Sequence, residues 1–123
     1  MNVSEFSKQV GITPHTTRYY DKIGLIGNVR RMPNGHRVFS QKDIQWIEFV
    51  QRLKETDMPL KSILAYAKLR EKGACTLEAR KAMLVNHARM LSDIINKQQG
   101  HLEALSNKIG LYDEMLTSHS PLD

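Results

Sequence analysis

The sequence has little cysteine and no long hydrophobic run. One cysteine in 123 residues excludes an internal disulfide framework and a cysteine-rich zinc site. No apolar run reaches the ~18 residues of a membrane span, and the first residues lack the pattern of a secretory signal. The histidines are scattered, and neither a glycine-rich phosphate loop nor a known nucleophile spacing is present. We therefore expect a cytoplasmic protein that is not an enzyme, needs no cofactor or metal, and does not enter a membrane.

Positive charge is concentrated in the first part of the chain. Residues 1–70 hold twelve Lys and Arg against six Asp and Glu, whereas residues 71–123 hold six against seven. This asymmetry predicts a polyanionic partner, such as nucleic acid, for the first part alone. The alternative is a small basic protein whose charge serves no partner.

Two short helices are expected at the start of the chain. Ser4 is a candidate cap for the first, which Gly11 ends. Thr13 and Pro14 are typical of a helix start, and they predict a second helix that runs through residues 15–22. Two short helices joined by a glycine-containing turn form a candidate helix-turn-helix.

Residues 28–40 predict a β-hairpin. Asn34-Gly35 favours a type I′ turn, with arms over Val29–Pro33 and His36–Phe39. A two-stranded hairpin is not stable alone, so this one should pack on the neighbouring helices as a wing. Ser40–Asp43 resembles a capping box that opens a third helix.

Three further helices are expected after the hairpin. The third should end near Thr56, and the fourth should run from Pro59 to Gly73. A long helix, capped by Thr76, should then cover residues 76–116. At ~1.5 Å per residue it would be roughly 60 Å long.

Two interleaved seven-residue series run along the predicted long helix, which is the pattern of a coiled-coil seam. A chain this small cannot cover such a helix, so a second molecule is required. The predicted dimerisation residues are Leu77, Leu84, Ala88, Leu91, Ile95, Leu102, Leu105, Ile109 and Tyr112. Gly100 and Gly110 each cost the helix ~1 kcal/mol relative to alanine and mark sites for a kink. The last residues, from Thr117, should fray.

The chemistry of the basic part favours DNA binding. Arginine in a helix that enters the major groove can bind guanine or a phosphate, and tyrosine and threonine hydroxyls donate to phosphates. The predicted contacts on the second helix are Thr16, Thr17, Arg18, Tyr19 and Tyr20; those on the wing are Arg30, Arg31, Asn34, His36 and Arg37; Lys61 adds one on the fourth helix. Two alternatives stay open: Tyr20 packs in the core, and the hairpin is a solvated basic loop.

Cys75 lies just before the predicted long helix. The positive end of a helix raises thiol reactivity, so this residue is a candidate sensor of electrophiles. The alternative is an inert small residue.

These residues resemble the MerR family of bacterial transcription regulators over nearly the whole chain. The resemblance rests on the opening helix and turn, Thr17–Asp21 followed by Gly24-Leu25-Ile26, Asn34–Ser40 with Asp43-Ile44, and the terminal coiled coil. Phe39 stands where the family usually has tyrosine, so a hydroxyl is missing there.

Within the family, residues 43–49 and 76–81 look similar to the branch that answers thiol-reactive aldehydes and related stress. That branch carries its reactive cysteine where this chain has Arg52, so the resemblance does not extend to the aldehyde response. The cysteine-bearing loop of metal-sensing members is also missing, which argues against a metal effector.

The resemblance implies a mainly α fold. A winged helix-turn-helix with a small β-hairpin would occupy residues 1–72, and residues 73–123 would form an antiparallel dimerisation helix with a frayed tail. It also implies a homodimer that binds pseudo-palindromic promoter DNA, distorts the promoter spacer, acts on RNA polymerase indirectly and answers an unknown effector. The remaining alternatives are a coiled-coil interaction protein and a DNA-architectural protein without regulatory output.

Overall fold

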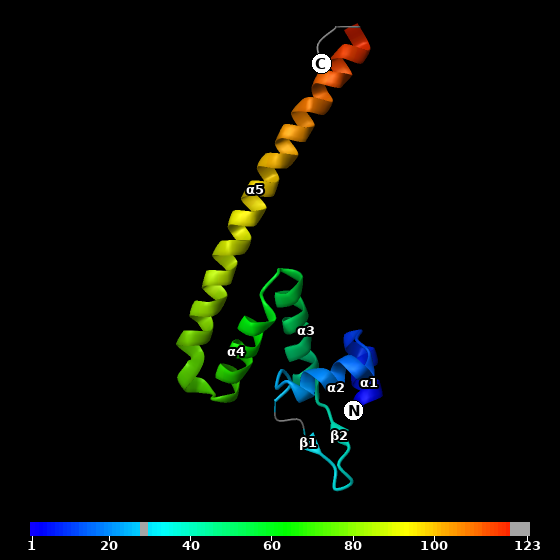
Figure 1. The fold of residues 1–123 in the computed structure, drawn as a ribbon, viewed down its shortest axis with the longest axis vertical. Helices are drawn as coiled ribbons and strands as arrows, with labels where there is room; N and C mark the ends of the chain where they lie inside the picture. The colour runs from blue at the N-terminus through cyan, green and yellow to red at the C-terminus, as the bar shows by residue number, and fades with distance from the viewer. Residues whose placement is uncertain (28–29, 119–123) are drawn as a thin grey trace. The chain divides into compact units, whose positions relative to one another are not determined.

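The computed structural model describes residues 1–27 and 30–118. This part of the chain is mainly helical, with a two-stranded hairpin and a long last helix, as predicted (Figure 1). The elements are α1 (Val3–Val10), α2 (Pro14–Lys22), β1 (Arg30–Arg31), β2 (Arg37–Val38), α3 (Gln41–Glu55), α4 (Leu60–Glu71), the 3₁₀ helix η1 (Ala74–Thr76) and α5 (Leu77–Ser118).

The contacts divide the chain into two compact units, Met1–Leu84 and Val85–Asp123. The first unit holds every element up to η1 and the first two turns of α5, and we call it the head. The second unit is the remainder of α5 and the residues after it. Within the described ranges, no helix combines the length and the apolar character that a membrane span needs.

Helices α1 and α2 form the predicted pair around a short turn. Asn2, not Ser4, caps α1: its side chain accepts from the Glu5 backbone N–H at 2.9 Å. Gly11 ends α1 with φ +75°, in the left-handed region that glycine adopts without strain. Thr13 caps α2 as predicted and accepts from the Thr16 backbone N–H at 3.0 Å. The C-cap of α1 at Gly11 and the N-cap of α2 at Thr13 therefore set the length of the turn.

The wing is a hairpin with a three-residue loop. Gly35 N–H donates to the Met32 carbonyl, and Met32 N–H donates to the His36 carbonyl, both at 2.8 Å. The predicted type I′ turn is wrong, because it requires positive φ at both Asn34 and Gly35 and only Gly35 has it. Pro33 favours the second position of an ordinary turn, and the glycine after that turn takes the left-handed conformation. The part of the first arm at Val29 lies outside the described residues.

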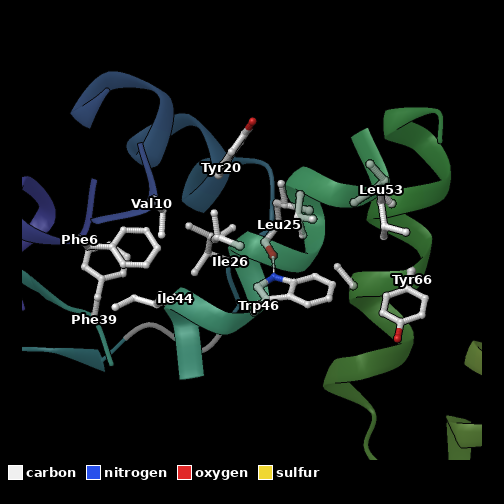
Figure 2. Packing of buried hydrophobic residues seen from close by; sticks show 14 of the residues in the cluster. Phe6, Val10, Tyr20, Leu25, Ile26, Phe39, Ile44, Trp46, Leu53 and Tyr66 are labelled. Atoms are coloured by element: carbon white, nitrogen blue, oxygen red, sulfur yellow. Dashed lines mark hydrogen bonds between the residues drawn. The ribbon is translucent and has the colours of Figure 1, made fainter. Parts of the chain in front are cut away.

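The hydrophobic core lies where α1, α2, α3 and α4 meet (Figure 2). Phe6 is fully buried and stacks on Phe39, with ring centroids 4.3 Å apart, so the wing is attached to the first helix. Trp46 stacks on Tyr66 and donates from Nε1 to the Leu25 carbonyl at 2.8 Å. The core therefore satisfies its indole N–H, which a buried tryptophan requires.

Helix α5 runs without interruption from Leu77 to Ser118, through Gly100 and Gly110. The helix is therefore not broken at either glycine. Thr76 is not the side-chain cap that the sequence suggested, because its hydroxyl donates to the carbonyls of Leu69 and Gly73 at 2.6 and 2.8 Å. Thr117 and Ser118 are helical, and the rest of the predicted frayed tail lies outside the described residues.

Replacing Phe6 with alanine should lower the free energy of unfolding by about 3–5 kcal/mol, because it leaves a cavity beneath the wing. Urea unfolding at one fixed protein concentration measures the change, because the apparent free energy of unfolding of a dimer depends on the protein concentration. Met32→Ala is the control: this side chain is 50% exposed on the hairpin. Its effect should stay within about 0.5 kcal/mol. Equal effects of the two variants would contradict the packing described for Phe6.

Candidate nucleic-acid interface

Helix α2 presents three of its predicted contact residues toward solvent. Arg18 is exposed, Tyr19 is 46% exposed and Thr16 is half-buried. The backbone N–H of Thr16 donates to Thr13 Oγ1 and is thereby part of the helix cap. The exposed part of α2 is therefore a short polar surface with two cations, Arg18 and Lys22.

Thr17 does not belong to this surface. Its side chain is fully buried, and its Oγ1 lies 2.7 Å from the Ser7 Oγ of α1. We therefore withdraw Thr17 from the residues expected to contact DNA. Its hydroxyl has a structural role, because a buried polar group needs a partner and Ser7 supplies one where α1 and α2 meet.

Tyr20 combines the two roles that the sequence left open. Its side chain is 6% exposed and its ring is part of the core, but its hydroxyl points away from the cluster (Figure 2). Lys54 of α3 donates to this hydroxyl at 2.8 Å. Sequence reasoning missed Lys54, because only the packing of α3 on α2 brings the two residues together.

A groove in the head brings residues of α2 and the wing together. It has a volume of about 320 Å³, and its lining includes Arg18 from α2 and His36 and Arg37 from the wing. Asn2 and Ser4, at the start of α1, line it as well. Neither was predicted as a contact residue. Their place at the start of a helix could have indicated them, because the free backbone N–H groups of a first helical turn can bind an anion.

Asp21 holds the two arginines of the wing that face α2. Its Oδ2 accepts from Arg31 at 3.3 Å and from Arg37 Nε, and Arg31 also donates to the Gly35 carbonyl at 3.0 Å. The wing is thereby fixed to the end of α2 by charge-assisted hydrogen bonds. One carboxylate shared by two guanidinium groups leaves a net positive charge at this place.

The other predicted contacts lie elsewhere on the head. Arg30 lines a separate cavity of about 470 Å³ with Lys42 and Arg70. Asn34 uses its side-chain oxygen in the turn, where it accepts from the His36 backbone N–H at 3.0 Å. Lys61 is exposed on the first turn of α4 and lines neither the groove at Arg18 nor the cavity at Arg30.

The seam predicted on α5 is largely uncovered. Leu84 packs against the core of the head and Leu91 is half-buried. The remaining seam residues are exposed: Leu77, Ala88, Ile95, Leu102, Leu105, Ile109 and Tyr112. A helix that exposes this many large apolar side chains has an apolar surface for a partner.

The model of the MerR HTH family of regulatory proteins matches residues 1–69. This range holds both helices of the turn, the wing, α3 and most of α4. The chain belongs to the MerR family. It is a DNA-binding transcription regulator of that family and not an enzyme.

Relatives agree with this membership. The MerR chain is 36% identical to the HTH-type transcriptional regulator AdhR of Bacillus subtilis over 91 residues, which are 74% of this chain and 65% of AdhR. A crystal structure of a MerR family regulator from Listeria monocytogenes superposes with a TM-score of 0.87 at 33% sequence identity. The match covers 97% of this chain and 90% of the Listeria chain. HiNmlR, a MerR family regulator lacking the sensor domain and crystallised with promoter DNA, has a TM-score of 0.80 at 33% sequence identity. The match covers 97% of this chain and 94% of the HiNmlR chain.

Thiol chemistry in this MerR chain is confined to Cys75. The side chain is exposed in η1, and its Sγ lies 3.6 Å from the Lys72 carbonyl oxygen. Arg52, at the position of the cysteine in the aldehyde-responding branch, is exposed on α3. In the described ranges no three His, Cys, Asp or Glu side chains are placed to hold a metal ion.

Asp21→Asn should loosen the wing. The amide loses the charge that holds Arg31 and Arg37, and two cations then lie close together without an anion between them. We expect the free energy of unfolding to fall by about 1–2 kcal/mol. Amide hydrogen exchange should also quicken at Met32 and Gly35, whose N–H groups close the hairpin.

Asp57→Asn is the matched control. Asp57 is exposed, forms no ion pair within the described part of the chain and has φ +65°, which asparagine tolerates. This variant should leave both the unfolding free energy and the exchange rates of the wing unchanged. Equal exchange at the wing in both variants would show that Asp21 does not fix it.

Proposed function

We propose that this MerR protein is a homodimeric, sequence-specific regulator that binds pseudo-palindromic promoter DNA and acts by distorting the promoter spacer. The observation that carries the proposal is the groove where Arg18 of α2 meets His36 and Arg37 of the wing. Two elements of a winged helix-turn-helix thus offer cationic or polar side chains to the same ligand. HiNmlR, which is similar over almost the whole chain, is described as bound to promoter DNA.

In the proposed complex α2 enters the major groove and the wing follows the backbone. Arg18 binds a guanine edge or a phosphate, and Thr16 and Tyr19 donate to phosphates. The wing contributes Arg30, Arg31, Asn34, His36 and Arg37, and Lys61 adds a phosphate contact. The N-terminal part, residues 1–72, would then be the DNA-binding domain, and residues 73–123 the dimerisation part.

The charges on α5 favour an antiparallel dimer. Residues 77–97 carry four basic residues (Lys or Arg) and two acidic residues (Asp or Glu), whereas residues 98–118 carry one basic and three acidic residues. A parallel pair would place like charges together, and an antiparallel pair places each basic half beside an acidic half. The exposed seam of α5 supplies the apolar contact.

A two-fold dimer with two basic heads matches two half-sites related by the same symmetry. Distortion of the spacer between them would change how RNA polymerase meets its two promoter elements, which is an indirect action through DNA shape. Cys75, which is exposed, stays a candidate sensor of electrophiles, and the alternative of an inert small residue stays open.

Arg18→Ala should weaken binding to specific DNA by about 1–3 kcal/mol, which is roughly 5- to 150-fold in the dissociation constant. Fragments recovered by genome-wide mapping of bound sites supply the specific DNA, and a gel shift against a scrambled duplex measures the preference. Lys97→Ala, which removes one positive charge from α5, is the control and should bind nearly as the wild type.

Each outcome separates the proposal from its alternatives. A wild-type protein without any duplex preference would indicate a coiled-coil interaction protein. Equal bending of specific and scrambled duplexes would indicate an architectural protein. Unchanged specific binding by Arg18→Ala would remove Arg18 from the interface.

Leu105→Asp should convert the dimer to a monomer at micromolar concentration, because Leu105 is 62% exposed on the seam and a carboxylate there would be buried by dimerisation. Analytical ultracentrifugation measures the mass. Asn107→Asp places the same charge two residues away, outside both seven-residue series, and should stay dimeric. A monomeric wild type would contradict the proposed assembly.

A further inference from the structure

Lys54, which is not among the predicted contacts, forms a polar pair with Tyr20, whose hydroxyl is. Lys54 lies in the last turn of α3, where its Nζ is 2.8 Å from the Tyr20 hydroxyl and 5.3 Å from the centre of the Tyr20 ring. The ring is buried, and this burial fixes the position of the hydroxyl. The hydroxyl thus sits at a defined place on the surface of the head.

The chemistry of lysine determines which way the tyrosine proton points. An ammonium group donates and never accepts, so the Tyr20 oxygen must accept from Lys54. The hydroxyl hydrogen is then left to donate to another group. Within the described residues no protein acceptor receives it, because the bond to Lys54 accounts for the contacts of this hydroxyl.

Lys54 also keeps its charge available. It is exposed and forms no ion pair in the part of the chain that the structure describes. One of its three N–H donors goes to Tyr20, and two remain. The pair therefore presents one O–H donor, at least one N–H donor and a positive charge, without an anion of the protein beside them.

We propose that Lys54 and the Tyr20 hydroxyl together bind one phosphate of the DNA backbone in each protomer. A phosphate has several acceptor oxygens and a negative charge, so it can accept from both groups at once. The rings of Tyr20 and the exposed Tyr19 lie 6.2 Å apart between centroids, which places this phosphate near the one proposed for Tyr19. This inference rests on the proposed function, since it adds a contact to the same interface.

The salt dependence of DNA binding tests the pair. If about six phosphates are neutralised per dimer, log affinity should fall with log salt with a slope near −5. Lys54→Met keeps the apolar stem and removes the charge from both protomers. It should reduce the magnitude of that slope by about two, and weaken binding to specific and scrambled duplexes alike.

Tyr20→Phe removes the hydroxyl and leaves the charge. This variant should bind DNA at least about fivefold more weakly, with a slope close to that of the wild type, because a neutral donor releases no counterion. Combining the two changes should cost less than the product of the single effects, since both groups bind the same phosphate. Lys68→Met, the same change on an exposed lysine of α4, is the control.

The results distinguish failure of the pair from failure of the proposed function. An unchanged slope for Lys54→Met, together with weaker binding by Arg18→Ala, would overturn the pair and leave the function intact. A lower melting temperature for Lys54→Met with an unchanged slope would assign Lys54 to packing on the Tyr20 ring and also overturn the pair. A wild type that binds no duplex would overturn both.

Discussion

The contact between Phe6 and Phe39 is the interaction on which the rest of the head depends. It stacks the first helix on the strand that leaves the wing, and the backbone N–H of Phe39 donates to the Met1 carbonyl at 2.7 Å beside it. The family position usually taken by tyrosine is thereby a core position in this chain. The stack joins the wing to α1 and Asp21 joins it to α2, so both sides of the groove at Arg18 are held to the wing by direct contacts.

The helices and their order could be predicted because their signals are local. Thr13, Pro14 and Gly11 act within one turn of the chain, and the structure places α2 where they indicate. The predicted turn type of the wing was wrong because two local signals compete there. Asn34-Gly35 favours a two-residue loop, whereas Pro33 fits the start of a three-residue one. The structure adopts the second.

The candidate site was harder to predict, because which side of α2 is buried depends on a distant part of the chain. Thr17 and Tyr20 lie three residues apart and share a helix face, and that face packs on α1 and the core. A nine-residue helix with many polar residues does not reveal this choice. The pairs Asp21–Arg37 and Tyr20–Lys54 join residues 16 and 34 positions apart, so they exist only once the helices and the wing are packed.

The exposed seam of α5 links DNA affinity to assembly. An isolated helix with this apolar surface gains its stability from packing, so pairing and helix order should change together. In the proposed dimer, the second of two linked heads would bind its half-site as an intramolecular event, and a single head would lose that advantage. A seam variant such as Leu105→Asp should therefore weaken DNA binding although it touches no residue of the head. Under the proposed function, the stability of α5 would therefore affect DNA recognition as Arg18 does.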